Sequence, residues 1–225
     1  MSIKEELTWL SWSSGKDSAW TLYQLQNSSN YKVDKLFTTI NKKYGRAAMH
    51  GTSLDILKAQ AQAAELPIEI IELPDPCDNA TYLSIMSEFV CKAEELKLAT
   101  MAFGDLFLQD IRNYREQNLE SSSVAAIFPL WHQDTKNLAV AMIEHGLKAI
   151  ICCVDTKQLP ADFLGREFDN SFLSDLPASV DPCGENGEFH TCVYAGPMFK
   201  HNLPLQIGGI HTHGQFHWCQ LSIAA

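Results

Sequence analysis

The chain has 225 residues, 46% of them hydrophobic, so it can bury a large core in one domain with an appended substructure. Its formal net charge of −10 argues against sequence-independent binding to nucleic acid through a broad basic surface. The sequence shows neither a long apolar run that would span a membrane nor the apolar core of a signal peptide. The seven cysteines are odd in number and include no C-x-x-C pair, which favours buried, reduced thiols. We therefore expect a cytoplasmic protein with no membrane partner.

The stretch S-S-G-K-D-S at residues 13–18 follows an apolar run at residues 7–12 and precedes another at residues 19–25. This pattern predicts a turn from a buried strand into a helix. The N-terminus of a helix exposes unpaired N–H groups and a partial positive charge, and small residues let a phosphate approach them closely. Lys16 would add a full positive charge, and Asp17 could hold the magnesium ion of a nucleotide. An ordinary capped turn is the alternative.

The same stretch departs from the Walker pattern, because it has no upstream glycine and Lys16 is followed by Asp17. It resembles instead the S-G-G-x-D-S pyrophosphate loop of the N-type ATP pyrophosphatases, with Ser14 at the first glycine. Enzymes of that superfamily cleave ATP between its α- and β-phosphates. The substitution fits the loop provided that Ser14 keeps a negative φ.

Downstream, strands alternate with helices. Strands are predicted at residues 33–40, 67–73, 100–105, 126–130 and 149–155, and helices at 54–65, 79–98, 109–119 and 136–145, with Ser53 and Thr135 as N-caps. Alternating elements with continuous apolar strands predict an α/β fold whose parallel sheet is covered by helices on both faces. Ligands of such sheets bind beyond the carboxyl ends of the strands. We expect these residues to converge there: residues 13–18, Thr38, Thr39, Gly104, Asp105 and Asp155.

The composition shifts near residue 156 toward proline, glycine and shorter patterns. We expect an ATP-binding domain at residues 1–155 and a smaller C-terminal α+β substructure at residues 156–225, packed on its substrate side. Alternation in residues 204–221 predicts strands there. His211, His213 and His217 would lie on one face of a strand, which is compatible with a metal site, but we favour a plain strand whose polar side faces water.

A second cluster of polar residues lies at residues 181–191, with the sequence D-P-C-G-E-N-G-E-F-H-T. Glu185 and Glu188 could hold a cationic amine, accept a proton or bind magnesium, whereas an exposed turn is the alternative. Together with residues 13–18, the Gly104-Asp105 pair and the run V-Y-A-G-P-M-F-K at residues 193–200, this segment resembles the diphthine–ammonia ligase family and its adenine-nucleotide α-hydrolase-like relatives.

The resemblance implies a five-stranded parallel sheet of the adenine-nucleotide α-hydrolase type, which is a Rossmann-like fold. Archaeal and eukaryotic members amidate the diphthine carboxylate of elongation factor 2 with ATP and ammonium. This sequence looks closer to relatives whose substrate is not settled. The implied chemistry has two steps: a carboxylate attacks ATP to give an acyl-adenylate and pyrophosphate, and ammonia or an amine then displaces AMP. The expected ligands are ATP, Mg²⁺ and an acceptor carboxylate on a protein side chain or a small metabolite.

Site roles follow from position and resemblance. We assign pyrophosphate binding to Ser13, Gly15, Lys16 and Ser18, magnesium binding to Asp17, and the adenine side to Thr38, Thr39 and Ile40. Ser14 and Gly104 are further candidates for binding the nucleotide. Acceptor-side candidates are Asp105, Arg112, Tyr114, Arg115, Glu185, Glu188, His190 and Thr191. Glu188 is the leading candidate for orienting or deprotonating the amine, in a catalytic set with Lys16, Asp17 and Glu185. Arg112 and Arg115 share a helix face and could grip a carboxylate or phosphate, or else pair with neighbouring acids.

Two other functional classes stay open. One is a nucleotide-binding regulatory or sensor module without turnover. The other is a sulfur transferase like those that thiolate tRNA, for which Cys183 or Cys192 would supply the catalytic thiol. Oligomeric state is also open, a homodimer included.

Overall fold

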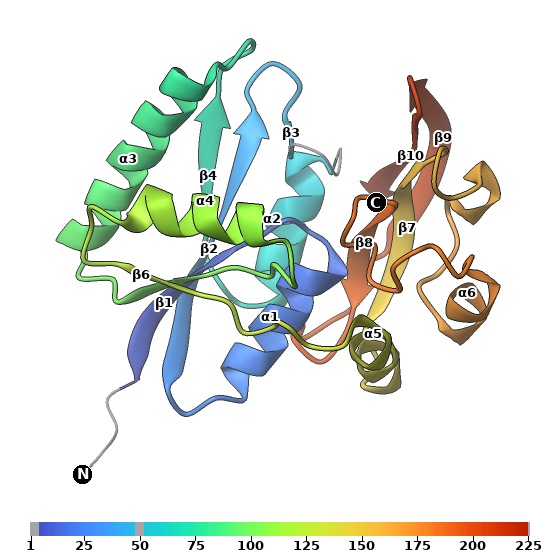
Figure 1. The fold of residues 1–225 in the computed structure, drawn as a ribbon, viewed down its shortest axis with the longest axis horizontal. Helices are drawn as coiled ribbons and strands as arrows, with labels where there is room; N and C mark the ends of the chain where they lie inside the picture. Colours follow the sequence, from blue (N-terminus) through green and yellow to red (C-terminus); the bar gives the residue numbers. More distant parts are fainter. Residues whose placement is uncertain (1–4, 48–51, 225) are drawn as a thin grey trace.

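The computed structural model describes residues 5–47 and 52–224, which form two sheets with helices around them (Figure 1). Five parallel strands run in the order β4-β2-β1-β5-β6. Their bounds are β1 Glu6–Ser11, β2 Tyr31–Asn41, β4 Ile68–Leu73, β5 Thr100–Ala102 and β6 Ala125–Ile127, and the short β3 Arg46–Ala47 pairs antiparallel with β2. This arrangement confirms the predicted α/β fold with a five-stranded parallel sheet. The strand order reverses between β1 and β5, and such a switch point is where ligands of parallel sheets bind.

The predicted helices lie close to their expected positions, as α1 Lys16–Gln26, α2 Leu54–Ala63, α3 Asn79–Glu95, α4 Gln109–Leu119 and α5 Thr135–Glu144. Two short helices at other positions are η1 Ala161–Phe163 and α6 Asn170–Asp175. Ser53 caps α2 as predicted, by accepting a hydrogen bond from the Ile56 N–H. The predicted cap of α5 is wrong, because Asp134 caps that helix and the Thr135 hydroxyl instead donates to the Asp181 carboxylate at 2.6 Å. None of the described helices is long and apolar enough to cross a bilayer.

Side chains of β1 alternate between two apolar layers, as the period of two in a strand requires. Trp9 packs with Phe37 and Phe89 in the layer under α3 and α4. Leu10 faces the opposite layer, where it joins Trp20 of α1. Burial of one such large apolar side chain contributes about 2 kcal/mol. Both faces of β1 are thus buried against apolar side chains, which explains its nearly continuous apolar sequence.

The second sheet is antiparallel and has the order β8-β7-β10-β9. Its strands are β7 Lys148–Asp155, β8 Phe189–Ala195, β9 Leu205–His213 and β10 Phe216–Ile223. The expectation that residues 149–155 continue the parallel sheet is therefore wrong. Both faces of β7 are buried, with Ile151 in the large core and Ile150 against Ile56 of α2, so its apolar run fits either kind of sheet.

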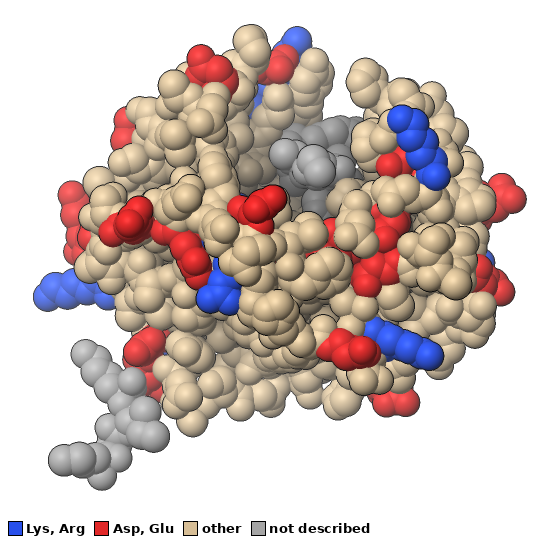
Figure 2. Space-filling model, viewed as in Figure 1, with Lys and Arg blue, Asp and Glu red and all other residues tan. Residues whose placement is uncertain are grey.

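The second sheet bears on two predictions about polar residues, one for Asp155 and one for the three histidines. Asp155 does not join the site, because its carboxylate accepts bonds from the Lys157 N–H and the Gln158 amide in a local turn. His211 and His213 lie on β9, but His217 lies on β10 opposite Thr212. In the described ranges no three His, Cys, Asp or Glu side chains are grouped to hold a metal ion. Acidic side chains are spread over the face seen in Figure 2, in line with the net charge.

Candidate active site

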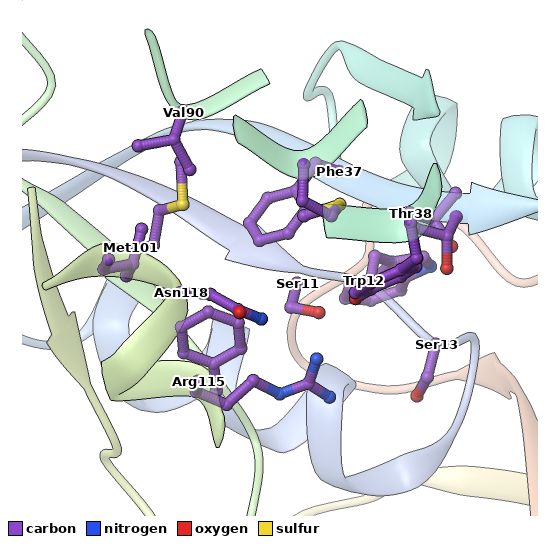
Figure 3. Close-up of a pocket in the computed structure, with 14 residues that line it drawn as sticks. Ser11, Trp12, Ser13, Phe37, Thr38, Val90, Met101, Arg115 and Asn118 are labelled. Atoms are coloured by element: carbon purple, nitrogen blue, oxygen red, sulfur yellow. The ribbon is translucent and has the colours of Figure 1, made fainter. Parts of the chain in front are cut away.

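Two adjoining cavities open at the carboxyl ends of β1, β2 and β5. The first has a volume of about 240 Å³ and the second about 380 Å³. Four residues line both cavities: Ser11, Ser13, Phe103 and Arg115. In Figure 3 the guanidinium of Arg115 extends from α4 toward Ser11. The cavities therefore form one continuous site at the switch point of the sheet.

The first cavity is mostly apolar. Its walls include Phe37, Thr38, Thr39, Tyr82, Met86, Val90, Met101, Asn118 and Leu119. Thr38 and Thr39 thus lie where the adenine side was expected. Ile40 does not, because it is buried in the core with Leu57 of α2. A mostly apolar cavity wall with a few polar groups is suited to binding a flat heteroaromatic ring.

The second cavity contains the loop at residues 13–18, which leads into α1. The Ser13 hydroxyl lies 3.2 Å from that of Ser18 and accepts from the Gly15 N–H at 3.3 Å. Gly15 is the N-cap of α1, so the helix begins at Lys16 and its N-terminus opens onto this cavity. The loop is backed by Gly104, where an added Cβ would lie 3.0–3.1 Å from backbone atoms of Asp17 and Ser18. The predicted strand–turn–helix geometry is confirmed, and helix N-termini of this kind can bind anions.

Ser14 adopts a φ of +74°, so the expected negative φ is wrong. A non-glycine residue in this left-handed region costs about 1 kcal/mol or more. Three hydrogen bonds hold it there: the buried Ser14 hydroxyl lies 2.7 Å from that of Thr52, and its carbonyl accepts from the Gln60 amide at 3.1 Å and the Val193 N–H at 3.0 Å. The loop therefore has a backbone conformation that glycine would adopt without strain, and in this chain polar contacts offset the strain at Ser14.

Lys16 joins the loop to the second sheet. Its buried Nζ donates to both Asp17 carboxylate oxygens at 2.8 and 2.9 Å and to the Cys183 carbonyl, and its N–H donates to the Thr191 hydroxyl at 3.0 Å. Burial is the largest single effect and would lower the pKa of Lys16, but its interactions with Asp17, Cys183 and Glu185 together raise the pKa above its usual value. Lys16 therefore stays charged at the floor of the second cavity.

The segment at residues 181–191 forms the opposite wall, but its two glutamates have different surroundings. Glu188 is buried, and its oxygens accept from the Asp181 N–H at 2.9 Å, the Asn186 N–H at 2.9 Å and the Asn186 amide at 3.0 Å. These hydrogen bonds fix the turn between Asp181 and Glu188. Glu188 is not among the residues that line the two cavities. This placement disagrees with the expectation that Glu188 acts on the amine.

Glu185 faces the second cavity instead. One of its oxygens accepts from the Leu106 N–H at 2.8 Å, which ties the segment to the loop after β5. Partial burial raises the pKa of Glu185 to about 7. His190 lines the same cavity, and burial lowers its pKa to about 4, so its imidazole is neutral at pH 7. Glu185 is thus the carboxylate poised to exchange a proton near neutral pH.

The two arginines of α4 have different surroundings, and for Arg112 the predicted alternative of pairing with a neighbouring acid is confirmed. Arg112 pairs with Glu116 at 2.8 Å and lies over the Phe128 ring, whereas Arg115 reaches both cavities and lies 3.6 Å from Asp105. Tyr114, expected on the acceptor side, stacks instead on Tyr82.

Two buried atoms, Arg115 Nε and Asp105 Oδ2, have no hydrogen-bond partner among the described residues. Burial also raises the pKa of Asp105. The two atoms face each other as an ion pair at 3.6 Å, slightly longer than a hydrogen bond, and both residues line the second cavity, where they can contact a polar ligand.

Some lining residues were not anticipated. Asn118 lies three residues after Arg115 on α4, so the helical period could have indicated it. Phe103 directly follows β5 and lines both cavities, as its position before Gly104 could have suggested. Tyr82 and Met86 come from α3, and only the packing of that helix brings them to the site.

A magnesium ion fits the donor set only together with phosphate. Asp17 and Asp105 both line the second cavity, and the buried Asp105 Oδ2 accepts no hydrogen bond from the described residues, although it lies 3.6 Å from the Arg115 Nε. Magnesium in nucleotide sites commonly uses one or two carboxylates plus phosphate oxygens. This fit does not require the cluster of three protein ligands that the described residues lack.

Comparisons with known proteins agree with the motifs. Residues 134–224 match the family model of the diphthamide synthase C-terminal domain. The chain is 30% identical over 100 residues to a diphthine–ammonia ligase of Schizosaccharomyces pombe, covering 43% of this chain and 16% of that protein. It is 29% identical over 112 residues to one of Bos taurus, covering 47% of this chain and 42% of the relative. The matches thus span less than half of either curated relative, and they show that the chain is similar to diphthine–ammonia ligases, as the motifs indicated.

Proposed function

We propose that the protein is an ATP-dependent, AMP-forming ligase that adenylates a carboxylate and transfers ammonia or an amine to it. The observation that carries this proposal is the meeting of an apolar and a polar cavity at Ser13 and Arg115, beside the N-terminus of α1. A nucleotide fits this shape with its adenine in the first cavity and its phosphates along the loop. The rest of the second cavity is left for the acceptor.

The loop supplies the phosphate contacts. N–H groups in the first turn of α1, the hydroxyls of Ser13 and Ser18, and the ammonium of Lys16 all border the second cavity. Close packing of Gly104 holds this backbone in place. Mg²⁺ held by Asp17 and Asp105 would neutralise part of the charge on the phosphates.

In the first step the acceptor carboxylate attacks the α-phosphorus of ATP, and the bond to the bridging oxygen of pyrophosphate breaks. Negative charge then develops on the phosphate oxygens. Arg115 stands at the junction of the cavities, where the α-phosphate would lie, and its guanidinium, which makes a long ion pair with Asp105 at 3.6 Å, can donate to it. Fixed donors of this kind stabilise the transition state because they need no reorganisation.

In the second step ammonia or an amine attacks the acyl carbon, and AMP leaves. The nitrogen must lose a proton, and we assign Glu185 as the acceptor of that proton because its pKa lies near 7 and it faces the cavity. Glu188 would act only through the loop that it holds. Like the relatives named diphthine–ammonia ligase, the protein would form an amide, on an acceptor whose identity its own cavity selects.

The thiol chemistry of a sulfur transferase is less well supported. Burial raises the pKa of Cys192 to about 12, and this residue lies in an apolar cluster with Cys219. Burial also raises the pKa of Cys183, whose thiol donates to the Thr135 carbonyl. Neither thiol is a ready nucleophile.

The experiment is to incubate the protein with α-labelled ATP, Mg²⁺, ammonium and a cell extract, and to follow labelled AMP and the gain of an amide. Arg115→Gln should lower AMP formation at least tenfold. Arg112→Gln is the matched control, with the same helix and charge change outside the cavities, and should retain activity. ATP binding without AMP formation under any acceptor condition would favour the regulatory module instead.

A further inference from the structure

We propose that the exposed edge of β9, residues Leu205–His213, is the surface on which a second copy of this chain docks by extending the antiparallel sheet. This proposal concerns assembly and does not depend on the proposed ligase activity.

The edge is open. Strand β9 is the last strand of its sheet and pairs only with β10 among the described strands, so its other side presents a row of backbone donors and acceptors (Figure 1). Eight of its nine residues are exposed. Two large apolar side chains are among them, Ile207 with 50% and Ile210 with 66% of its surface exposed. Long apolar edges are templates for pairing with another strand.

Two of the usual protections of such an edge, charge and proline, are missing from β9, although its pairing with β10 shifts register between Ile207 and Ile210. Natural proteins guard exposed edges with lysine and other charged residues, with proline, or with a covering helix or loop. Residues 201–225 contain no Asp, Glu, Lys or Arg, although the whole chain has 27 acidic and 17 basic residues. Strand β9 itself has no proline, and its Gly209 has nothing within 4 Å of an added Cβ. Another backbone can therefore approach closely.

The distribution of charge favours a second copy of the chain as the partner that binds to β9. Two copies with a formal charge of −10 each repel where acidic surfaces meet, but not at an edge without charge. A strongly basic or acidic partner would find no complementary charge on β9. A second β9 brings the same uncharged edge, and an antiparallel pair places each donor opposite an acceptor about a two-fold axis. No charged side chain needs to be desolvated at the pairing strands.

Sedimentation of the full chain over a range of concentrations tests the proposal. We expect a monomer–dimer equilibrium in the wild type and at least tenfold weaker association in Ile210→Lys, because a lysine on each copy would face its equivalent near the axis. Ile111→Lys is the matched control, since Ile111 is an exposed isoleucine on α4, and it should associate like the wild type.

Hydrogen exchange gives a second readout. Amides of residues 205–213 should become more protected as the concentration rises, while circular dichroism confirms that both variants are folded. A wild type that stays monomeric at the highest concentration would overturn the proposal. So would a dimer that Ile210→Lys leaves intact, or one whose new protection lies outside β9.

Discussion

Replacing Gly104 with alanine tests whether the loop at residues 13–18 needs its close backing. The added Cβ would lie 3.0 Å from the Asp17 carbonyl carbon, 3.1 Å from its oxygen and 3.1 Å from the Ser18 nitrogen. All three are backbone atoms, so no side chain can rotate away. The loop must therefore shift by a few tenths of an ångström at the start of α1.

The magnitude follows from two opposing effects. Overpacking of this kind destabilises the folded state by about 1–3 kcal/mol. Alanine also restricts the conformations of the unfolded chain, and this effect stabilises the fold by about 0.4–1 kcal/mol. A net cost of about 1–2 kcal/mol, expressed at the phosphate site, weakens ATP binding by about 5- to 30-fold. The assay is titration of Mg²⁺-ATP by calorimetry, with urea unfolding to measure stability.

Gly209→Ala is the matched control, because an added Cβ there meets nothing within 4 Å and no left-handed φ is involved. It should bind ATP like the wild type. If Gly104→Ala also binds ATP with unchanged affinity and stability, then the loop is not held by this contact and the reasoning fails.

Three further predictions concern charged and thiol groups of the site. Lys16→Met should abolish ATP binding and destabilise the fold by about 3 kcal/mol, because it leaves the Asp17 carboxylate without its buried partner; unchanged urea unfolding would contradict the ion-pair argument. Amide formation should increase as pH rises through about 7, where Glu185 loses its proton and becomes a base, and Glu185→Gln should remove this rise from the pH–rate profile; a rise that persists in the variant would exclude Glu185 as the base. Cys183→Ser and Cys192→Ser should each retain AMP formation, since neither thiol is activated, and loss of turnover in a folded variant would revive the sulfur transferase.

Local pattern was enough to predict much of the fold. The apolar run, the small-residue turn and the following amphipathic stretch predicted β1, the loop and α1 because each depends on neighbours in sequence. Alternation of strands and helices likewise predicted the parallel sheet. The motif around Lys16 predicted a turn from a strand into a helix, and in the structure this turn lines the second cavity at the switch point of the sheet.

The sequence could not assign β7 to its sheet. A strand buried on both faces is continuously apolar, whether its neighbours run parallel or antiparallel. Pairing of β7 with β8 and β10, which follow it by tens of residues, decided the matter. Because β7 belongs to the second sheet, Asp155 at its end does not lie at the expected site.

Tertiary contacts also decided which side chains face the cavities. Glu185 and Glu188 are three residues apart and chemically alike, yet bonds to Asp181 and Asn186 bury one while the Leu106 N–H draws the other to the cavity wall. On α4, Arg112 and Arg115 share a sequence pattern but differ in what packs against them.

The sequence by itself determined the strand–loop–helix unit, the parallel sheet and the family resemblance, because these depend on local periodicity and short motifs. Only the tertiary structure selected Glu185 and Arg115 over their neighbours and showed that Ser14 tolerates a left-handed backbone. Those outcomes depend on hydrogen bonds and burial between segments far apart in the chain, which no local pattern encodes.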